Sequence, residues 1–189
     1  MIGCNSQPVS ESTTNEEPTT VTEEPISENT EDESQAIASE VGSDTVSTTT
    51  ELKRVGKDNY GYLSVPENWV NFKDVDVTIP IVQVSDPTGT SIITLNTWNT
   101  EESTAELSAT SLWNKLEEEG VKDVTGAKVP LDIYSAFQVY GFYETENTIL
   151  IMWLFDTDDG NVHYVSAEST PETIMDVVQL VESSFSLEQ

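Results

Sequence analysis

Cysteine, histidine and positive charge are scarce in this chain of 189 residues. It has one Cys and one His, and its 7 Lys and Arg stand against 35 Asp and Glu, which gives a formal net charge of -28 at pH 7. A single Cys cannot form an intramolecular disulfide, and a single His leaves little from which to build a nucleophile and its base. So few cations exclude nucleic acid as a partner, because binding phosphates depends on Lys and Arg that displace counterions.

Long apolar runs are also missing, since none reaches the roughly 18 residues that a membrane-spanning helix needs. Residues 1–50 contain no Lys, Arg, His or aromatic residue and hold 11 of the acidic residues among Ser, Thr and three prolines. Such a segment buries too little apolar surface to offset the ordering of its backbone, which costs about 1 to 2 kcal/mol per residue. We therefore predict that residues 1–50 form a disordered acidic tether, of which residues 5–50 span roughly 35 to 40 Å.

Cys4 is the most informative residue of this tether. With Gly3 before it, it resembles the end of a bacterial lipobox, where a signal peptide is cut and the Cys becomes the acylated first residue. Stable anchoring needs more than one acyl chain, so we expect a multiply acylated (palmitate-type) Cys4 and a basic, apolar leader upstream of it. This predicts a lipoprotein at the extracytoplasmic face of the cell membrane. An acidic terminus with an incidental Cys is the alternative.

The composition changes at Glu51. All 7 Lys and Arg, all 4 Trp and the only His lie in residues 51–189, together with the remaining 24 acidic residues, so this part carries a formal charge of -17. Its length suits one domain with a sizeable apolar core. The predicted organisation is therefore a tether, 1–50, and a single folded domain, 51–189.

Apolar alternation and turn residues predict strands over 60–65, 75–85, 90–98, 121–129, 133–143, 148–155 and 161–167. In 148–155 the side chains that point to each face of the strand are apolar, so this strand should be covered on both faces. Because hairpins rather than crossovers join the later strands, the fold class is α+β. We expect a mainly antiparallel sheet of about six to seven strands, with two principal helices packed on its faces.

Two helices fit the remaining pattern. Ser103 and Glu106 have the spacing of a capping box, and Gly120 ends the apolar periodicity that follows. The last helix should be capped by Thr170, with Pro171 at its first position. The predicted buried residues of the two helices are Ala105, Ala109, Leu112, Trp113 and Leu116, then Ile174, Val177, Val178, Val181 and Phe185.

The segment from Tyr60 to Trp69, with its Pro-x-x-Trp turn, resembles the opening of the Mog/PsbP-like α+β fold family. The aromatic hairpin 136–155 and the closing Glu-Ser-Ser-Phe at 182–185 extend the resemblance over most of the domain. The family includes a photosystem II extrinsic subunit, a Ran-binding factor and bacterial lipoproteins. The resemblance implies a protein that acts by binding other proteins, and no site residue can be carried over.

The residues that could form a catalytic or metal-binding site do not match the known patterns of such sites. His163 lies in a predicted strand beside apolar residues, which favours a structural imidazole over a general base. Asp156, Asp158 and Asp159 precede Gly160, one position too early for an EF-hand loop, so a solvated hairpin turn explains them better. We predict no catalytic residue, no metal ligand and no cofactor.

Aromatic residues offer one candidate binding surface. Thr94, Asn96 and Trp98 alternate onto one side of their strand, so Trp98 should project from a polar face, and Trp69 sits at a turn where it could be partly exposed. Trp113 and Trp153 are expected in the core.

Two functional hypotheses follow. The first is a non-enzymatic surface lipoprotein, anchored to the membrane through Cys4, whose domain binds a surface or secreted protein or a wall component. The alternative is a carboxylate-dependent hydrolase or metal-dependent enzyme, which requires two converging Asp or Glu side chains of raised pKa.

Overall fold

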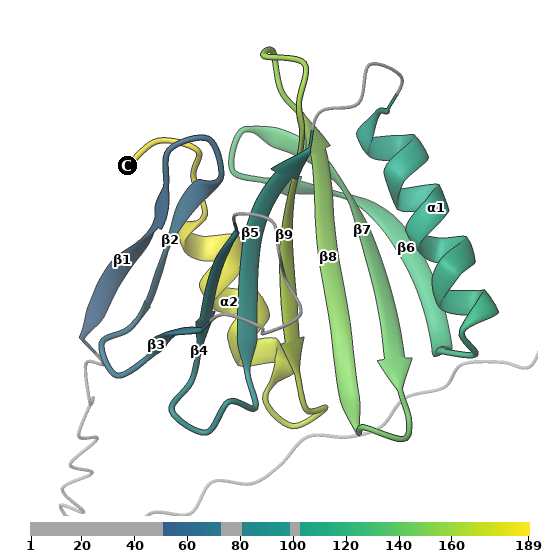
Figure 1. The fold of residues 1–189 in the computed structure, drawn as a ribbon, viewed down its shortest axis with the longest axis horizontal. Coiled ribbons are helices and arrows are strands. Elements are labelled where there is room, and N and C mark those ends of the chain that lie inside the picture. Colours follow the sequence, from purple (N-terminus) through teal and green to yellow (C-terminus); the bar gives the residue numbers. More distant parts are fainter. Residues whose placement is uncertain (1–50, 73–80, 99–102) are drawn as a thin grey trace, which may run out of the picture. The chain divides into compact units, whose positions relative to one another are not determined.

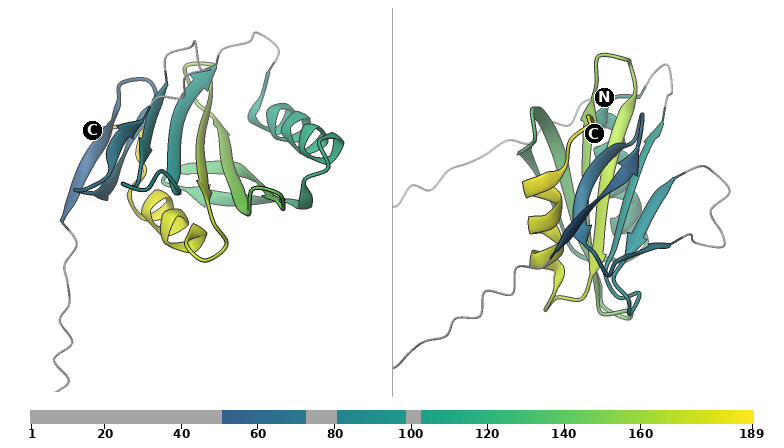
Figure 2. Two further views of the ribbon diagram at one scale, coloured as in Figure 1. Left: turned by 60° about the horizontal axis from the view of Figure 1, so that its bottom comes forward. Right: turned by 90° about the vertical axis from the view of Figure 1, so that its left-hand side faces the viewer.

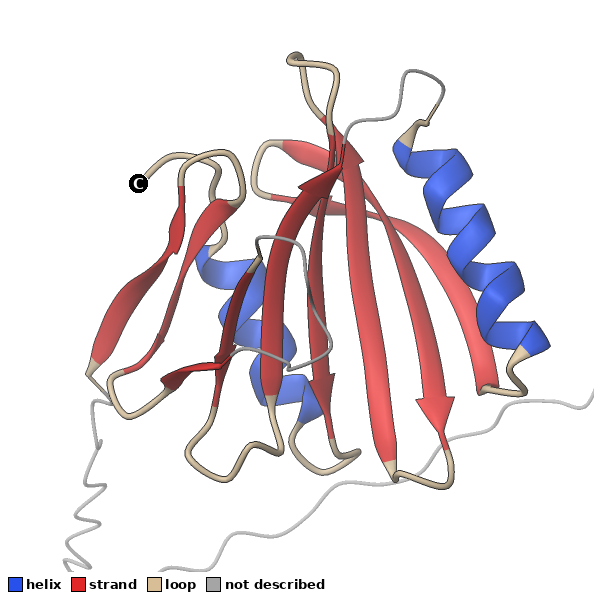
Figure 3. Cartoon of the chain, viewed as in Figure 1, coloured by secondary structure: helices blue, strands red, loops and turns tan. Residues whose placement is uncertain are grey.

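A computed structural model describes residues 51–72, 81–98 and 103–189 of the chain. These residues form nine strands and two helices (Figures 1 and 3). In chain order they are β1 (Leu52–Lys57), β2 (Gly61–Pro66), β3 (Val70–Phe72), β4 (Val82–Ser85), β5 (Ile92–Trp98), α1 (Ala105–Glu118), β6 (Lys122–Leu131), β7 (Tyr134–Tyr143), β8 (Thr148–Asp156), β9 (Val162–Ser169) and α2 (Ile174–Ser184).

Seven strands form one antiparallel sheet in the order β3-β4-β5-β9-β8-β7-β6, and β1 pairs with β2 in a separate hairpin. The four strands β6 to β9 follow one another as a meander, and β9 then pairs with β5. Helix α1 connects β5 to β6 and so carries the chain to the far edge of the sheet. The predicted α+β fold with a mainly antiparallel sheet and two principal helices is confirmed.

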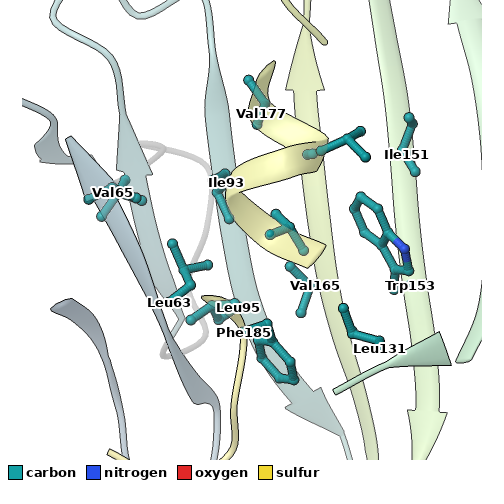
Figure 4. Packing of buried hydrophobic residues seen from close by; sticks show 14 of the residues in the cluster. Leu63, Val65, Ile93, Leu95, Leu131, Ile151, Trp153, Val165, Val177 and Phe185 are labelled. Carbon is teal, nitrogen blue, oxygen red and sulfur yellow. The ribbon is translucent and has the colours of Figure 1, made fainter. Parts of the chain in front are cut away.

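One face of the sheet packs against α2 and encloses the larger apolar cluster. Alternate residues of β8 enter it because successive side chains of a strand point to opposite faces. Trp153 and Phe155 of this set are fully buried. Figure 4 shows side chains of β5, β8, β9 and α2 converging here. The predicted stripe of α2 is buried, namely Ile174, Val177, Val178, Val181 and the capping Phe185.

The opposite face packs against α1, so the two helices lie on either side of the sheet (Figure 2). Ala105, Ala109 and Leu116 are the buried residues of α1, and they meet Leu150 and Leu154 of β8 in a smaller apolar cluster. Both faces of β8 are therefore covered, as predicted from the apolar side chains on both sides of this strand.

The hairpin of β1 and β2 is fastened to the end of α2. Tyr62 exchanges backbone hydrogen bonds with Ser186 at 2.8 and 2.9 Å. The Arg54 guanidinium donates at 2.5 Å to the Ser184 carbonyl, one of the carbonyl groups that a helix leaves unpaired at its end. The hairpin thus caps the helix and covers one side of the core.

Several predicted boundaries are wrong. Strands β1 and β3 are absent from the prediction, because β1 carries three cations and β3 has only three residues. Thr104, not Ser103, caps α1, since its extended backbone places its hydroxyl where it accepts from the Leu107 amide at 3.2 Å. Helix α2 begins after a turn at 171–173 rather than at Pro171. Of the predicted strand 75–85, residues 75–80 lie outside the described residues.

Among the described residues, no helix is both long and apolar enough to cross a membrane.

Candidate functional site

The predicted contact surface contains three residues whose side chains are buried, so the expectation that they are exposed is wrong. Trp69 is 6% exposed, Thr94 5% and Asn96 3%. The Trp69 amide donates to the Pro66 carbonyl at 2.9 Å in a tight turn, and this turn directs the indole into the large apolar cluster.

Thr94 and Asn96 do share the face that alternation assigned to them, but they bond to neighbouring strands there. Gln83 of β4 donates to the Thr94 hydroxyl at 3.2 Å, and the Asn96 amide donates to the Tyr164 hydroxyl of β9 at 3.2 Å. Burial raises the pKa of Tyr164, although the hydrogen bond from Asn96 opposes this rise. These polar groups hold the sheet in register, because a buried polar atom left without a partner is costly.

Trp98 is the last residue of β5, where it pairs with Val162. Its side chain lies outside what the structure describes, and so does the whole of Cys4, the predicted lipid attachment point.

His163, for which the sequence favoured a partly buried structural imidazole, is fully buried, with 2% of its surface exposed. Its ring stacks on Phe155 at 5.5 Å between centroids, and neither ring nitrogen has a hydrogen-bond partner in the part of the chain that the structure describes. Burial lowers the pKa of the imidazole, and the Asp159 carboxylate, 4.0 Å away, partly opposes this effect. A neutral imidazole without a hydroxyl partner is not arranged as a general base.

The carboxylates of the 156–160 turn have separate partners. Asp156 accepts from the Ala105 amide at 2.8 Å, at the start of α1. Asp159 accepts from the backbone amide of Asn161 at 3.0 Å and from its side-chain amide at 2.6 Å. In the described part of the chain no three His, Cys, Asp or Glu side chains gather closely enough to hold a metal ion.

The hydrolase hypothesis needs carboxyl groups of raised pKa, but Asp86, Asp159 and Glu172, the described carboxyl groups whose surroundings perturb them, all have a lowered pKa. The Thr157 hydroxyl and the Asn161 amide lower the pKa of Asp159, and a hydrogen bond from Thr170 lowers that of Glu172. For Asp86, burial acts to raise the pKa, but hydrogen bonds within its own turn outweigh it and lower the value. These groups are held as carboxylates, which is the opposite of a general acid.

The best candidate site is a groove of about 520 Å³ between α1 and strands β6 and β7. Its helical wall is formed by residues at i, i+3, i+4, i+7 and i+8, which share one face of α1. These are Glu106, Ala109, Thr110, Trp113 and Asn114. The strands contribute Gly126, Ala127 and Lys128 from β6, and Phe137, Gln138 and Val139 from β7.

Two aromatic rings line this groove and stay half-buried, namely Trp113 and Phe137. Gly126 permits the position of the indole, because a Cβ at this residue would lie 2.9 Å from Trp113 Cζ3. The Lys128 ammonium lies 5.0 Å from the centre of the Phe137 ring, close enough for a cation–π contact. Half-buried aromatic rings beside polar groups are typical of surfaces that bind peptides and proteins.

A second hollow, of about 470 Å³, lies between the β1–β2 hairpin and strands β3 and β4. Arg54 and Lys57 give it positive charge within an otherwise acidic domain. Arg54, however, already binds the carbonyls of Ser184 and Glu188, and Lys57 lies 5.5 Å from the Tyr60 ring. The cations here serve the fold, so this hollow is the weaker candidate.

Sequence reasoning missed the groove because it counted Trp113 as a core residue. Trp153, the other Trp expected in the core, is fully buried, whereas Trp113 is half-buried. The available signal was Gly126 in the middle of a predicted strand, which marks a close approach by another group.

No protein-family model matches the chain, and no curated protein matches it in sequence. Among solved structures, the chain is similar to cyanobacterial PsbP (CyanoP) from Synechocystis sp. PCC 6803, with a TM-score of 0.52 and 9% sequence identity. The match covers 77% of this chain and 98% of that one. The PsbP-like fold predicted from the sequence is therefore confirmed, and identity this low carries the fold alone.

The chain is also similar to LpqN, a protein involved in cell envelope biogenesis of Mycobacterium tuberculosis. The identity is 13% and the TM-score is 0.39, with coverage of 72% of this chain and 90% of that chain. So low a score supports no inference about this protein.

Proposed function

We propose that this chain is a lipid-anchored protein of the extracytoplasmic surface whose PsbP-like domain binds a protein or wall-associated peptide through the groove between α1 and β6–β7. The groove carries the proposal, because it gathers two half-buried aromatic rings beside small and polar residues. Such rings give a large contact area and lose little conformational freedom on binding.

The location rests on the sequence. Gly3-Cys4 has the form of a lipobox end, and residues 5–50, which contain no Lys, Arg or aromatic residue, separate it from the domain. A flexible tether of this length spans roughly 35 to 40 Å, which is enough for the domain to reach wall and surface partners.

A hydrolase or metal-dependent enzyme is the weaker hypothesis. The imidazole of His163 is buried and has no hydrogen-bond partner among the described residues, and the pKa values of Asp86, Asp159 and Glu172 are lowered. Of the described residues that line the groove, one carries a carboxylate, Glu106, and one an amine, Lys128. A binding role uses these groups as they stand, whereas hydrolysis needs a second acid or base beside them.

Binding is tested by recovering partners from the native cell surface with the full-length chain and two variants. Trp113→Ala removes the indole from the groove, whereas Met175→Ala removes a side chain that is 67% exposed on α2, on the other face of the sheet. The proposal expects a partner that the parent and Met175→Ala retain and that Trp113→Ala loses. Equal recovery by all three would place binding elsewhere, and no recovery by the parent would remove the binding role.

Anchoring is tested separately, by mass spectrometry of the mature N-terminus in the native host. The proposal expects Cys4 as the first residue, carrying acyl chains. An unmodified Cys4 thiol would contradict it and would leave the binding proposal standing.

A further inference from the structure

Strand β6 is an edge of the seven-stranded sheet, and among the described residues it pairs only with β7. The strand runs for ten residues, and its central part from Thr125 to Lys128 is exposed. The opposite edge, β3, has only three residues. An edge strand of this length offers a row of unpaired backbone groups to another chain.

The ladder shows which backbone groups point outward. Asp132 and Ile133 form a two-residue loop, so the flanking pair of Leu131 and Tyr134 closes the hairpin with hydrogen bonds. Hydrogen-bonded and non-bonded pairs alternate along an antiparallel ladder. Gly126 and Lys128 therefore direct their N–H and C=O groups away from β7.

Pro130 alternates with Gly126 and Lys128 along β6, so its backbone also faces away from β7, but proline has no N–H to donate. A bulge between Lys122 and Thr125 interrupts the ladder at the other end of β6. Proline and bulges are common protections of edge strands against unwanted pairing. Here they occupy the two ends and leave the stretch from Thr125 to Lys128 open.

This open stretch coincides with the groove. Gly126 and Lys128 both line it, and their side-chain face is the one that meets Trp113 and Phe137. A chain that adds to β6 therefore places alternate side chains on the face where Trp113 lies, whereas Phe137 lies on β7, one strand further into the sheet. Peptide-binding domains combine strand addition for affinity with side-chain pockets for specificity in this way.

Charge selects the occupant. Residues 51–189 carry a formal charge of -17, and the tether adds 11 carboxylates without a single Lys or Arg. A second copy of the domain and the chain's own tether are thus both repelled, whereas a cationic segment is attracted. At the groove itself the charges balance, with Glu106 on α1 and Lys128 on β6, and β6 also carries Lys122 and Asp123, so the preference for a cation comes from the charge of the whole domain.

We propose, on the premise that this groove is the binding surface, that a cationic peptide segment in extended conformation adds to β6 as a further strand. It bonds to the backbone of Gly126 and Lys128 and packs an apolar side chain against Trp113.

The test is titration calorimetry of the full-length chain with a peptide of about ten residues in which Lys and Val alternate. Two isomers accompany it, one N-methylated at each Val and one at each Lys. Alternate residues of an added strand direct their N–H groups toward β6, and the residues between them direct theirs away. The isomer that is methylated only on the N–H groups pointing away should therefore bind as the parent peptide does. The other should bind roughly tenfold or more weakly, since its methyl groups remove the N–H groups that would donate to β6.

Two variants of one residue examine the protein side. Lys128→Pro removes an outward N–H and a charge, and Lys128→Ala removes the charge alone. We expect Lys128→Ala to bind the peptide at least as tightly as the parent chain. Lys128→Pro should bind it roughly three- to tenfold more weakly than Lys128→Ala does. Circular dichroism checks that both variants fold. If Lys128→Pro does not fold, the two N-methylated peptides still test strand addition, because they are measured against the parent chain.

Strand addition is overturned if both isomers bind alike, if the peptide fails to bind, or if a Glu-for-Lys peptide binds better. It is also overturned if the chain dimerises through β6 or if its tether occupies the groove. When Trp113→Ala loses the surface partner but the isomers bind alike, groove binding stands and strand addition falls. When Trp113→Ala retains that partner, the proposed function itself falls.

Discussion

The two faces of the sheet differ in how completely their helices cover them. Under α2, Phe155 is fully buried and stacks on Tyr134 at 4.6 Å between centroids, whereas under α1 Phe137 stays half-buried at the wall of a groove. The sheet is the same, but one face is closed and the other is open beside an edge strand. The closed face supplies stability, and the open face supplies the candidate binding surface.

Replacing the same residue type on each face should give the largest contrast. Phe155→Ala removes a fully buried ring and should lower the free energy of unfolding by about 3 to 5 kcal/mol. Phe137→Ala removes a half-buried ring and should cost about 1 kcal/mol. Urea denaturation measures both, and equal losses would show that the two faces contribute alike.

The closed face should also respond to acid through His163. Its pKa is lowered from the ordinary 6.5 by burial, so the unfolded chain takes up a proton that the folded chain refuses. Stability should therefore be unaffected above pH 6.5 and should fall as the pH drops below it. His163→Leu should remove this part of the slope and raise stability by about 1 kcal/mol, since it deletes two unpaired buried nitrogens. Identical pH profiles for parent and variant would contradict this.

Asp156 joins β8 to the start of α1 on the open face. Its carboxylate accepts from the Ala105 amide at 2.8 Å, so Asp156→Ala should cost about 1 kcal/mol through loss of a helix-terminal hydrogen bond. The neighbouring Asp158→Ala is the matched control, with almost no expected loss. Thermal unfolding compares the two, and a larger loss for the control would refute the assignment.

The smallest effect on stability is expected at Gly126. A Cβ there would press on the half-exposed edge of Trp113, which can shift at a cost of about 1 kcal/mol or less. Gly126→Ala should therefore alter the fluorescence of Trp113 and weaken partner binding while leaving the fold intact. Gly89→Ala has no described residue within 4 Å of the added Cβ, but it strains a left-handed turn residue (φ 74°) outside the groove, so it controls for a loss of stability without a change in the groove. An equal loss of binding there would argue against the groove.

The closed face could be predicted from the sequence, and the open face could not. Val177 and Val181 recur at helical spacing, and Trp153 and Phe155 alternate along a strand, so local periodicity assigns them to the core. Whether Trp113 is fully buried or half-exposed depends on how far α1 lies from β6. The spacing of apolar residues in the sequence gives no information on that distance. Thr94 and Asn96 were likewise assigned to the right face, but their hydrogen bonds to other strands depend on register.

The most direct measurement of the central claim uses a photo-crosslinking amino acid at Thr110, which lines the groove, and separately at Met175, which is exposed on α2. Illumination of native cells followed by mass spectrometry should identify a partner peptide joined to position 110 and none joined to position 175. A partner captured at position 175, with none at position 110, would contradict the account.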